Sequence, residues 1–378
     1  MAQRNKKLLY HIYWGTAGNA GLYLDEIYKV LEKAGYKQKA FVNYYYPFDY
    51  GEKVFYKYTE LGHCKVKRFR GPIRYLELLW ALLRIWVRTI IDKPRVINYS
   101  LIGSFRIVNY YLRFSQKVLG CKIVLTCHDV IPFASASQAA DAEMNNRRRV
   151  LSIADYLLVH NNYSKKTLQE IFAVKEDRIV MHPFPVMDLG LLIKNAKIKY
   201  SNSDFLFIGH LRREKGVDVL LKAWEIVHKE CPKAILRIAG NLPSIENLDV
   251  TEYRGRSDIE FKLQFLTDEE YCGLINAARF VVLPYKDGTN SGVVSTVLSL
   301  NSEVIASDIP MFDQNPLIDK TLLFKSEDVS SLASTMIAAF KMNENGIRSS
   351  NTITQYREQF ELKVNEVYNL FYIKDSIK

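Results

Sequence analysis

The stretch FLFIGHLRREKGVDVLLKAW, residues 205–224, carries the clearest indication of the fold class. It opens with apolar residues that predict a buried strand, turns at Gly209, and continues after Gly216 in an amphipathic pattern that predicts a helix. Inward-facing positions of that helix follow a helical spacing: Val217, Leu220, Leu221, Trp224 and Val227. A strand, a glycine turn and a helix in this order indicate a βα unit of a parallel sheet.

The same stretch suits an anionic ligand. The start of a helix offers unpaired N–H groups and a favourable dipole, and Arg and Lys side chains bind a diphosphate well. Arg212, Arg213 and Lys215 lie between the two glycines. The alternative is that these three cations form a solvated basic turn.

Short apolar runs alternate with helical patterns along the rest of the chain, which favours an α/β protein with doubly wound, Rossmann-like domains. At 378 residues the chain exceeds the usual size of one hydrophobic core. We therefore predict an N-terminal domain at 1–185, a second domain at 186–355 and a C-terminal helix at 356–378, with a linker at about 183–203.

Composition excludes several classes of protein. The hydrophobic fraction of 48% and charged fraction of 25% are ordinary for a globular protein. Five cysteines (Cys64, Cys121, Cys127, Cys231, Cys272) show no CxxC spacing, so neither a disulfide framework nor a zinc site is expected. The basic N-terminus lacks an apolar run long enough for a signal peptide. A cytoplasmic location is predicted.

The net charge of +11 calls for an anionic partner: nucleic acid, a membrane surface or a phosphorylated substrate. Nucleic acid is disfavoured because no recognisable module with base-stacking aromatic residues is present.

The segment from Gly209 to Gly216 resembles the Gly-Arg-Leu-x3-Lys-Gly signature of retaining glycosyltransferase family 4. The resemblance implies the GT-B fold, with two Rossmann-like domains facing across a cleft. It also implies that Arg212 and Lys215 clasp the pyrophosphate of a nucleotide sugar. His210 stands where the family usually has Arg, so its role is left open.

A second segment, VVLPYKDGTNSGVVSTVLSLNSEVIASDIP (281–310), resembles the family's glycine turn at a helix start. By this resemblance the donor-binding positions are Thr289, Asn290, Ser291, Gly292 and Val293. The family's Glu-x7-Glu pair falls on Thr289 and Val297, so both glutamates are absent, as in a divergent subgroup. A simple helix cap by Asn290 or Ser291 is compatible with donor binding.

Two N-terminal segments complete the resemblance. KIVLTCHDVIPF (122–133) resembles the family strand that carries a His-Asp pair to the cleft, here His128 and Asp129. A single His at a strand end is more often structural when taken alone. The turn WGTAGNAGLYLDEI (14–27) resembles the loop that faces donor and acceptor, with Gly15 and Asn19 as candidates. The C-terminal helix resembles the closing helix of the family, which packs on the first domain.

Residues 65–91 combine basic residues with an amphipathic helix, so this segment predicts contact with an anionic membrane surface. The apolar face is predicted to hold Leu76, Leu79, Leu83, Trp86 and Ile90. The alternative is a core helix with a solvated arginine stripe. A transmembrane helix is not expected, because the most apolar run, 76–91, is short and carries Glu77, Arg84 and Arg88.

The resemblance predicts a retaining hexosyltransferase that uses a nucleotide diphosphate sugar, with UDP as the expected nucleotide. The acceptor would be a sugar or a lipid-linked oligosaccharide in bacterial surface polysaccharide synthesis, at the inner face of the membrane. No cofactor and no metal is expected beyond the nucleotide-sugar co-substrate. The alternatives are a nucleotide-sugar epimerase or a phosphorylase on the same fold, or a non-catalytic partner subunit.

Overall fold

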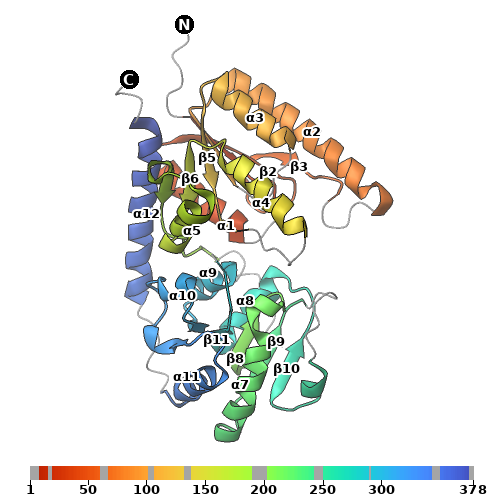
Figure 1. The fold of residues 1–378 in the computed structure, drawn as a ribbon, viewed down its shortest axis with the longest axis vertical. Helices are drawn as coiled ribbons and strands as arrows, with labels where there is room; N and C mark the ends of the chain where they lie inside the picture. The colour runs from red at the N-terminus through yellow and green to blue at the C-terminus, as the bar shows by residue number, and fades with distance from the viewer. Residues whose placement is uncertain are drawn as a thin grey trace. The chain divides into compact units, whose positions relative to one another are not determined.

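The computed structural model describes residues 8–15, 19–59, 67–100, 106–131, 138–189, 202–241, 250–288, 291–342 and 350–373. The chain divides into two compact units (Figure 1). Unit 1 comprises residues 1–185 and 358–378, and unit 2 comprises Val186–Arg357.

Unit 1 is built on a parallel sheet of seven strands in the order β3-β2-β1-β4-β5-β6-β7. The strands are β1 (Leu8–Ile12), β2 (Lys37–Asn43), β3 (Glu52–Phe55), β4 (Val96–Ser100), β5 (Lys122–Thr126), β6 (Tyr156–Val159) and β7 (Ile179–Met181). Most of their residues are buried apolar side chains, as expected for strands with helices on both faces.

The helices of unit 1 cover both faces of its sheet. They are α1 (Asn19–Lys33), α2 (Lys67–Asp92), α3 (Arg106–Lys117), α4 (Gln138–Leu151) and α5 (Asn162–Phe172). One apolar cluster joins the sheet to α2, α3, α4 and α5 through side chains such as Ile85 and Leu112. The other joins it to α1 and to the end of α12 (Ser350–Ile373), for example through Tyr23 and Phe371. The sheet is therefore doubly wound.

Unit 2 repeats this architecture with six parallel strands in the order β10-β9-β8-β11-β12-β13. The strands are β8 (Ser203–Ile208), β9 (Leu236–Ala239), β10 (Ile259–Lys262), β11 (Ala278–Leu283), β12 (Glu303–Ser307) and β13 (Leu323–Phe324). The helices are α7 (Val217–Glu230), α8 (Asp268–Asn276), α9 (Gly292–Ser299), α10 (Pro310–Asp313) and α11 (Val329–Lys341), with short 3-10 turns that include η2 (Arg213–Lys215). The predicted α/β class is confirmed.

Helix α2 differs from the prediction in the orientation of its apolar side chains. It spans Lys67–Asp92 and contains Pro72 in its second turn, where the missing N–H costs one intrahelical hydrogen bond. The predicted apolar face is wrong in part. Trp86 packs edge-on against Phe114 of α3 at 5.1 Å, and the side of α2 in the core carries Leu78 and Ile85. Leu76, Leu83 and Ile90 stay exposed.

No helix in the described ranges is long and apolar enough to cross a membrane. Four of the five cysteines lie in those ranges, and each is buried and outside any disulfide: Cys121, Cys127, Cys231 and Cys272. Cys64 lies outside the described residues.

Candidate functional site

The first group of candidate residues lies at the switch point of the unit 2 sheet. Strands β8 and β11 are neighbours, and the chain continues from β8 to β9 on one side before it reaches β11 on the other. In open α/β sheets, ligands bind outside the carboxyl ends of the strands at such a point. Gly209 follows β8 and Pro284 follows β11, so both segments singled out from the sequence meet there.

Glycine is required at two positions around this point. Gly216 adopts a φ of +67°, and a Cβ atom there would lie 1.7 Å from the carbonyl oxygen of Pro284. Gly240, after β9, adopts a φ of +138°, and a Cβ atom would lie 1.8 Å from the carbonyl oxygen of Gly209. The turns after three strands therefore pack backbone against backbone, and only glycine allows so close an approach.

Lys215 is held over an aromatic ring. Its Nζ atom lies 3.6 Å from the ring centre of Tyr285, which is fully buried. The Tyr285 hydroxyl interacts with Ser291, the residue that precedes α9. This links the basic turn after β8 to the start of α9, and it orients the ammonium group without neutralising its charge.

Arg212 adds to the positive field, and His210 lies within that field. Arg212 is half-exposed, and its guanidinium lies 3.9 Å from the carboxylate of Glu214. Partial burial, and then the charges of Arg212 and Lys215, lower the pKa of His210. His210 therefore lies among the cations, and a bound anion would relieve their mutual repulsion.

Helix α9 begins at this site. The Ser291 side chain caps it by accepting a hydrogen bond from Val294 N at 3.4 Å, and a Cβ atom on Gly209 would lie 3.6 Å from Val293 Cγ2. Gly292 is the first residue of the helix. Thr289 and Asn290 lie outside the described residues. Val297, at the position of the family's second glutamate, points into the core and is fully buried.

The second group lies in unit 1 and centres on His128, which follows β5. His128 Nδ1 lies 3.2 Å from His160 Nε2, and His160 Nδ1 lies 3.4 Å from the carbonyl oxygen of His182. A carbonyl only accepts, so His160 carries its proton on Nδ1 and accepts from His128 at Nε2. His182 donates from Nδ1 to Pro183 O at 2.8 Å, so its Nε2 accepts from the Tyr23 hydroxyl at 3.0 Å.

Burial keeps these three imidazoles neutral. It lowers the pKa of His128 to about 4, with a further contribution from His182, and it lowers the pKa of His182 to about 4. The pKa of His160 falls well below its usual value for the same reason, with contributions from the other two rings. Within the described part of the chain, no group of three or more His, Cys, Asp or Glu residues has the geometry of a metal site. The cluster is a hydrogen-bonded support for His128.

The remaining candidates lie near His128 or beside it in the fold. Asp129 is half-buried next to His128. Gly15 follows β1, at the same edge of the unit 1 sheet as the end of β5. Asn19 is the first residue of α1, and its side chain lies outside the described ones. One turn later, the ring of Tyr23 meets His128 edge-on at 4.8 Å.

Sequence reasoning missed Tyr285, His160, His182 and Tyr23. For the histidines a signal was present, since His128, His160 and His182 each come at or just after the end of an apolar run that forms a strand. Adjacent parallel strands bring such residues together at one edge. Nothing in the sequence distinguished Tyr285, because a tyrosine directly after a buried strand is usually a core residue.

Comparison with known proteins places a family match on unit 2. Residues 202–341 match the family model described as "Glycosyl transferases group 1". The match covers most of unit 2, including Gly209, Lys215, Tyr285 and α9.

Relatives of known sequence match over short segments. GDP-mannose:glycolipid 4-beta-D-mannosyltransferase of Xanthomonas campestris pv. campestris is 31% identical over 140 residues, which is 35% of this chain and 39% of that protein. An uncharacterized glycosyltransferase of Haemophilus influenzae is 43% identical over 58 residues, 15% of this chain and 16% of that protein. The aligned segments thus span well under half of these relatives.

Solved structures match over nearly the whole chain. Sucrose-phosphate synthase from Thermosynechococcus elongatus has a TM-score of 0.61 at 15% identity and covers 98% of this chain and 97% of its own. An alpha,alpha-trehalose-phosphate synthase (UDP-forming) from Burkholderia xenovorans has a TM-score of 0.57 at 12% identity, with coverages of 97% and 99%. The fold is GT-B, and the sequence matches support a glycosyltransferase.

Proposed function

We propose that the protein transfers a hexose from a nucleoside diphosphate sugar to a sugar or lipid-linked acceptor. The observation that carries this proposal is the position of Lys215, fixed over Tyr285 at the switch point of unit 2 beside the start of α9. Fixed cations and helix amides stabilise the charge that develops on a departing diphosphate. The glycosyltransferase relatives support the same class of reaction.

In the proposed reaction the bond between the anomeric carbon and the diphosphate oxygen breaks, and the acceptor hydroxyl oxygen bonds to that carbon. The acceptor attacks from the face that the diphosphate leaves, so the anomeric configuration is retained. Its proton passes to the departing diphosphate, so little help from a general base is needed. Arg212 and Lys215 bind the diphosphate, and residues 289–293 hold the sugar or the β-phosphate. His128 and Asp129 would contact the sugar.

The proposal is tested first by binding. We expect UDP or GDP to bind the full chain, and Arg212→Ala and Lys215→Ala each to weaken binding by about tenfold or more, since a charge-assisted contact contributes about 1.5–3 kcal/mol. The matched control is Lys222→Ala, which removes an exposed cation from α7 of the same unit. Calorimetry that finds unchanged affinity in the Lys215 variant would contradict the proposed clasp.

A second experiment identifies the donor sugar nucleotide and the stereochemistry of the transfer. UDP is the nucleotide expected from the sequence, whereas the Xanthomonas relative is named for GDP-mannose, for a glycolipid acceptor and for a 4-beta linkage. A screen of UDP- and GDP-sugars by hydrolysis, followed by NMR of the first product, identifies the donor and the anomeric configuration. An inverted product would refute the retaining mechanism. Nucleotide binding without any transfer would favour the non-catalytic partner subunit.

A further inference from the structure

We infer that α2 and α3 form a docking surface for an anionic lipid bilayer. Helix α2 exposes a continuous row of large apolar side chains, although its opposite side is already packed in the core. The row, here called the α2 stripe, consists of Phe69, Leu76, Trp80, Leu83, Val87 and Ile90. This inference does not depend on the proposed transferase activity.

The α2 stripe is a continuous feature of the helix. Its members recur at intervals of three, four or seven residues, so they lie on one side over a length of about 32 Å at 1.5 Å per residue. Leu76 and Trp80 are each 63% exposed, and Leu83 is 50% exposed. Single exposed apolar residues are ordinary on a protein surface, but a contiguous row of this length marks an interaction site.

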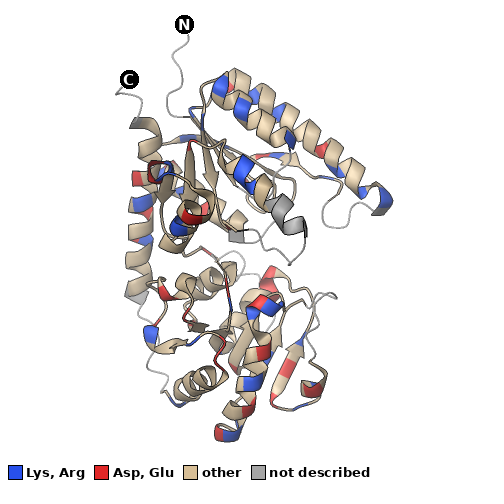
Figure 2. Ribbon diagram, viewed as in Figure 1, with Lys and Arg blue, Asp and Glu red and all other residues tan. Residues whose placement is uncertain are grey.

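Helix α3, which packs beside α2, adds positive charge (Figure 2). Arg106, Arg113 and Lys117 are exposed and follow a helical spacing, so they lie on one side of α3; together they are called the α3 basic face. Tyr110 is exposed on the same side. An apolar row next to a basic face is the arrangement of a helix that lies in the headgroup region of an anionic membrane.

The acidic residues of the segment 67–118 are only Glu77 and Asp92, and both are engaged within unit 1. Glu77 accepts hydrogen bonds from the Tyr58 backbone N–H and from the Thr59 hydroxyl, each at 2.5 Å. Asp92 pairs with Lys39 and accepts a hydrogen bond from Tyr10. Lys39 therefore offsets the charge of Asp92, and the Glu77 carboxylate is turned toward Tyr58 and Thr59, so the basic residues of the segment outnumber its acidic ones.

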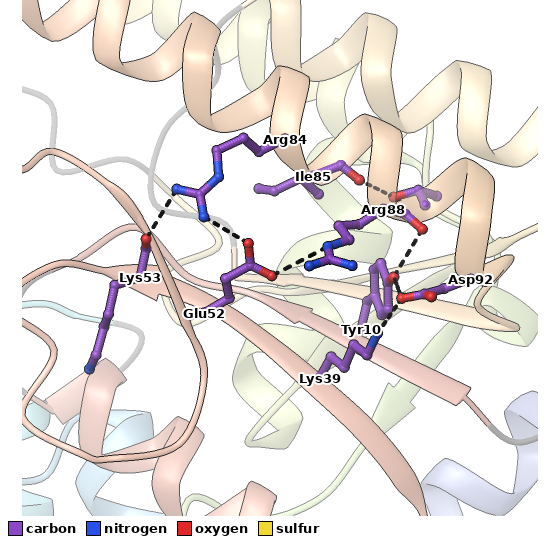
Figure 3. A network of polar contacts seen from close by, with 9 residues as sticks. Tyr10, Lys39, Glu52, Lys53, Arg84, Ile85, Arg88 and Asp92 are labelled. Carbon is purple, nitrogen blue, oxygen red and sulfur yellow. Dashed lines mark hydrogen bonds and ion pairs between the residues drawn. The ribbon is translucent and has the colours of Figure 1, made fainter.

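Polar contacts along one edge of α2 also hold the helix with the α2 stripe facing outward (Figure 3). Arg84 Nη2 lies 2.8 Å from Glu52 Oε1, and Arg88 Nε lies 3.8 Å from Glu52 Oε2, both reaching toward β3. The Tyr10 hydroxyl, which donates to Asp92, also lies 3.2 Å from Arg88 O. These contacts, with the buried side of the helix, prevent α2 from rotating its stripe inward.

The positive charge of the α3 basic face favours an anionic bilayer, rather than a second copy of the chain, as the partner of this surface. A two-fold interface would place the same patch on both subunits, so the α3 basic face of one copy would meet that of the other or lie close to it. Like charges brought together in this way oppose association. An anionic bilayer matches the basic face and accepts the apolar stripe at the same time.

The test is binding of the full chain to vesicles of phosphatidylcholine with phosphatidylglycerol, compared with phosphatidylcholine alone. We expect flotation with the anionic vesicles that weakens with salt, and a blue shift of Trp80 emission that is absent in Trp80→Phe. Arg106→Gln/Arg113→Gln/Lys117→Gln should weaken binding about a hundredfold, at about fivefold per basic residue. Leu76→Gln/Trp80→Gln/Leu83→Gln should also abolish flotation.

Matched controls separate this surface from general charge and hydrophobicity. Lys222→Gln/Lys229→Gln/Lys233→Gln removes the same charge from exposed positions of unit 2, and Phe265→Gln/Leu362→Gln removes exposed apolar residues elsewhere. Both should bind vesicles as the wild type does. The thermal unfolding and nucleotide affinity of every variant report that the fold is intact.

Two outcomes would overturn the inference. One is absence of flotation with anionic vesicles at low salt, whether or not the protein binds nucleotides. The other is a dimer in sedimentation equilibrium that the α2 stripe variant dissociates, because this would assign the stripe to a second copy.

Discussion

The ammonium group of Lys215 lies 3.6 Å from the ring centre of Tyr285, so a cation of the turn after β8 is positioned by a buried residue after β11. The contact thereby joins two segments that lie about seventy residues apart in the sequence. The ring face attracts the cation and fixes the position of its ammonium group, while the positive charge remains.

Replacing this ring should loosen Lys215. We expect Tyr285→Leu to weaken binding of UDP or GDP by about tenfold, because a desolvated cation–π contact contributes on the order of 1–2 kcal/mol. Tyr285→Phe keeps the ring and is expected to stay within about threefold of the wild type. Calorimetry decides, and equal losses in the two variants would show that the hydroxyl at Ser291, rather than the ring face, positions the site.

Gly216 should be far less replaceable than a glycine in open space. Gly216→Ala places a methyl group against the carbonyl of Pro284, so we expect a loss of about 3 kcal/mol or more, and a Tm lower by about 6–12 °C. Gly255 adopts a φ of +84° with nothing within 4 Å of its Cβ position. Gly255→Ala should therefore cost only about 1–2 kcal/mol. Similar Tm values for both variants would refute the proposed contact.

The buried histidines make stability depend on pH. The folded-state pKa values of His11, His128 and His182 are about 4, below the usual 6.5, so the unfolded chain binds more protons between these limits. Stability should fall as the pH drops from about 6.5 toward 4, by on the order of 2 kcal/mol per histidine at about pH 5. Thermal unfolding at several pH values measures this. His182→Gln should show a shallower dependence, and an unchanged slope would contradict it.

The hydrogen-bond chain predicts the tautomer of each imidazole. His128, His160 and His182 should each carry the proton on Nδ1, because each Nδ1 faces an acceptor. Selective ¹⁵N labelling of histidine with long-range ¹H–¹⁵N correlation distinguishes the two tautomers. His160→Phe removes the acceptor of His128 and should release His128 from the Nδ1–H form, whereas an Nε2–H signal from His128 in the wild type would contradict the chain.

The sequence predicts the fold class well, because buried strands and amphipathic helices each have a recognisable periodic pattern of apolar residues. It also singles out the glycine turn from Gly209 to Gly216, since a strand, cations and a helix start are local features. It does not show contacts between distant segments. Tyr285 under Lys215 and His160 beside His128 depend on strand order, which single segments do not encode.

The sequence predicts the orientation of α2 less well than it predicts the fold class. Its pattern is apolar on more than one side, so periodicity alone does not decide which side enters the core. Trp86 and Leu76 look equivalent in the sequence, yet Trp86 packs on Phe114 and Leu76 is exposed. The choice is made by neighbours from other parts of the chain, namely α3 and the Glu52 carboxylate on β3.

Helix α12 belongs to both units, and its last part supplies Phe360, Val364, Val367, Tyr368 and Phe371 to the core of unit 1. During synthesis on the ribosome, the first 185 residues of unit 1 emerge long before this part. At about 5–20 residues per second, the intervening unit 2 takes on the order of 10–30 s to translate. During that time α1 covers only part of this face of the unit 1 sheet, and the area that α12 will cover stays exposed. The nascent chain can therefore bind chaperones, and a C-terminal truncation would destabilise the unit whose first 185 residues were made first.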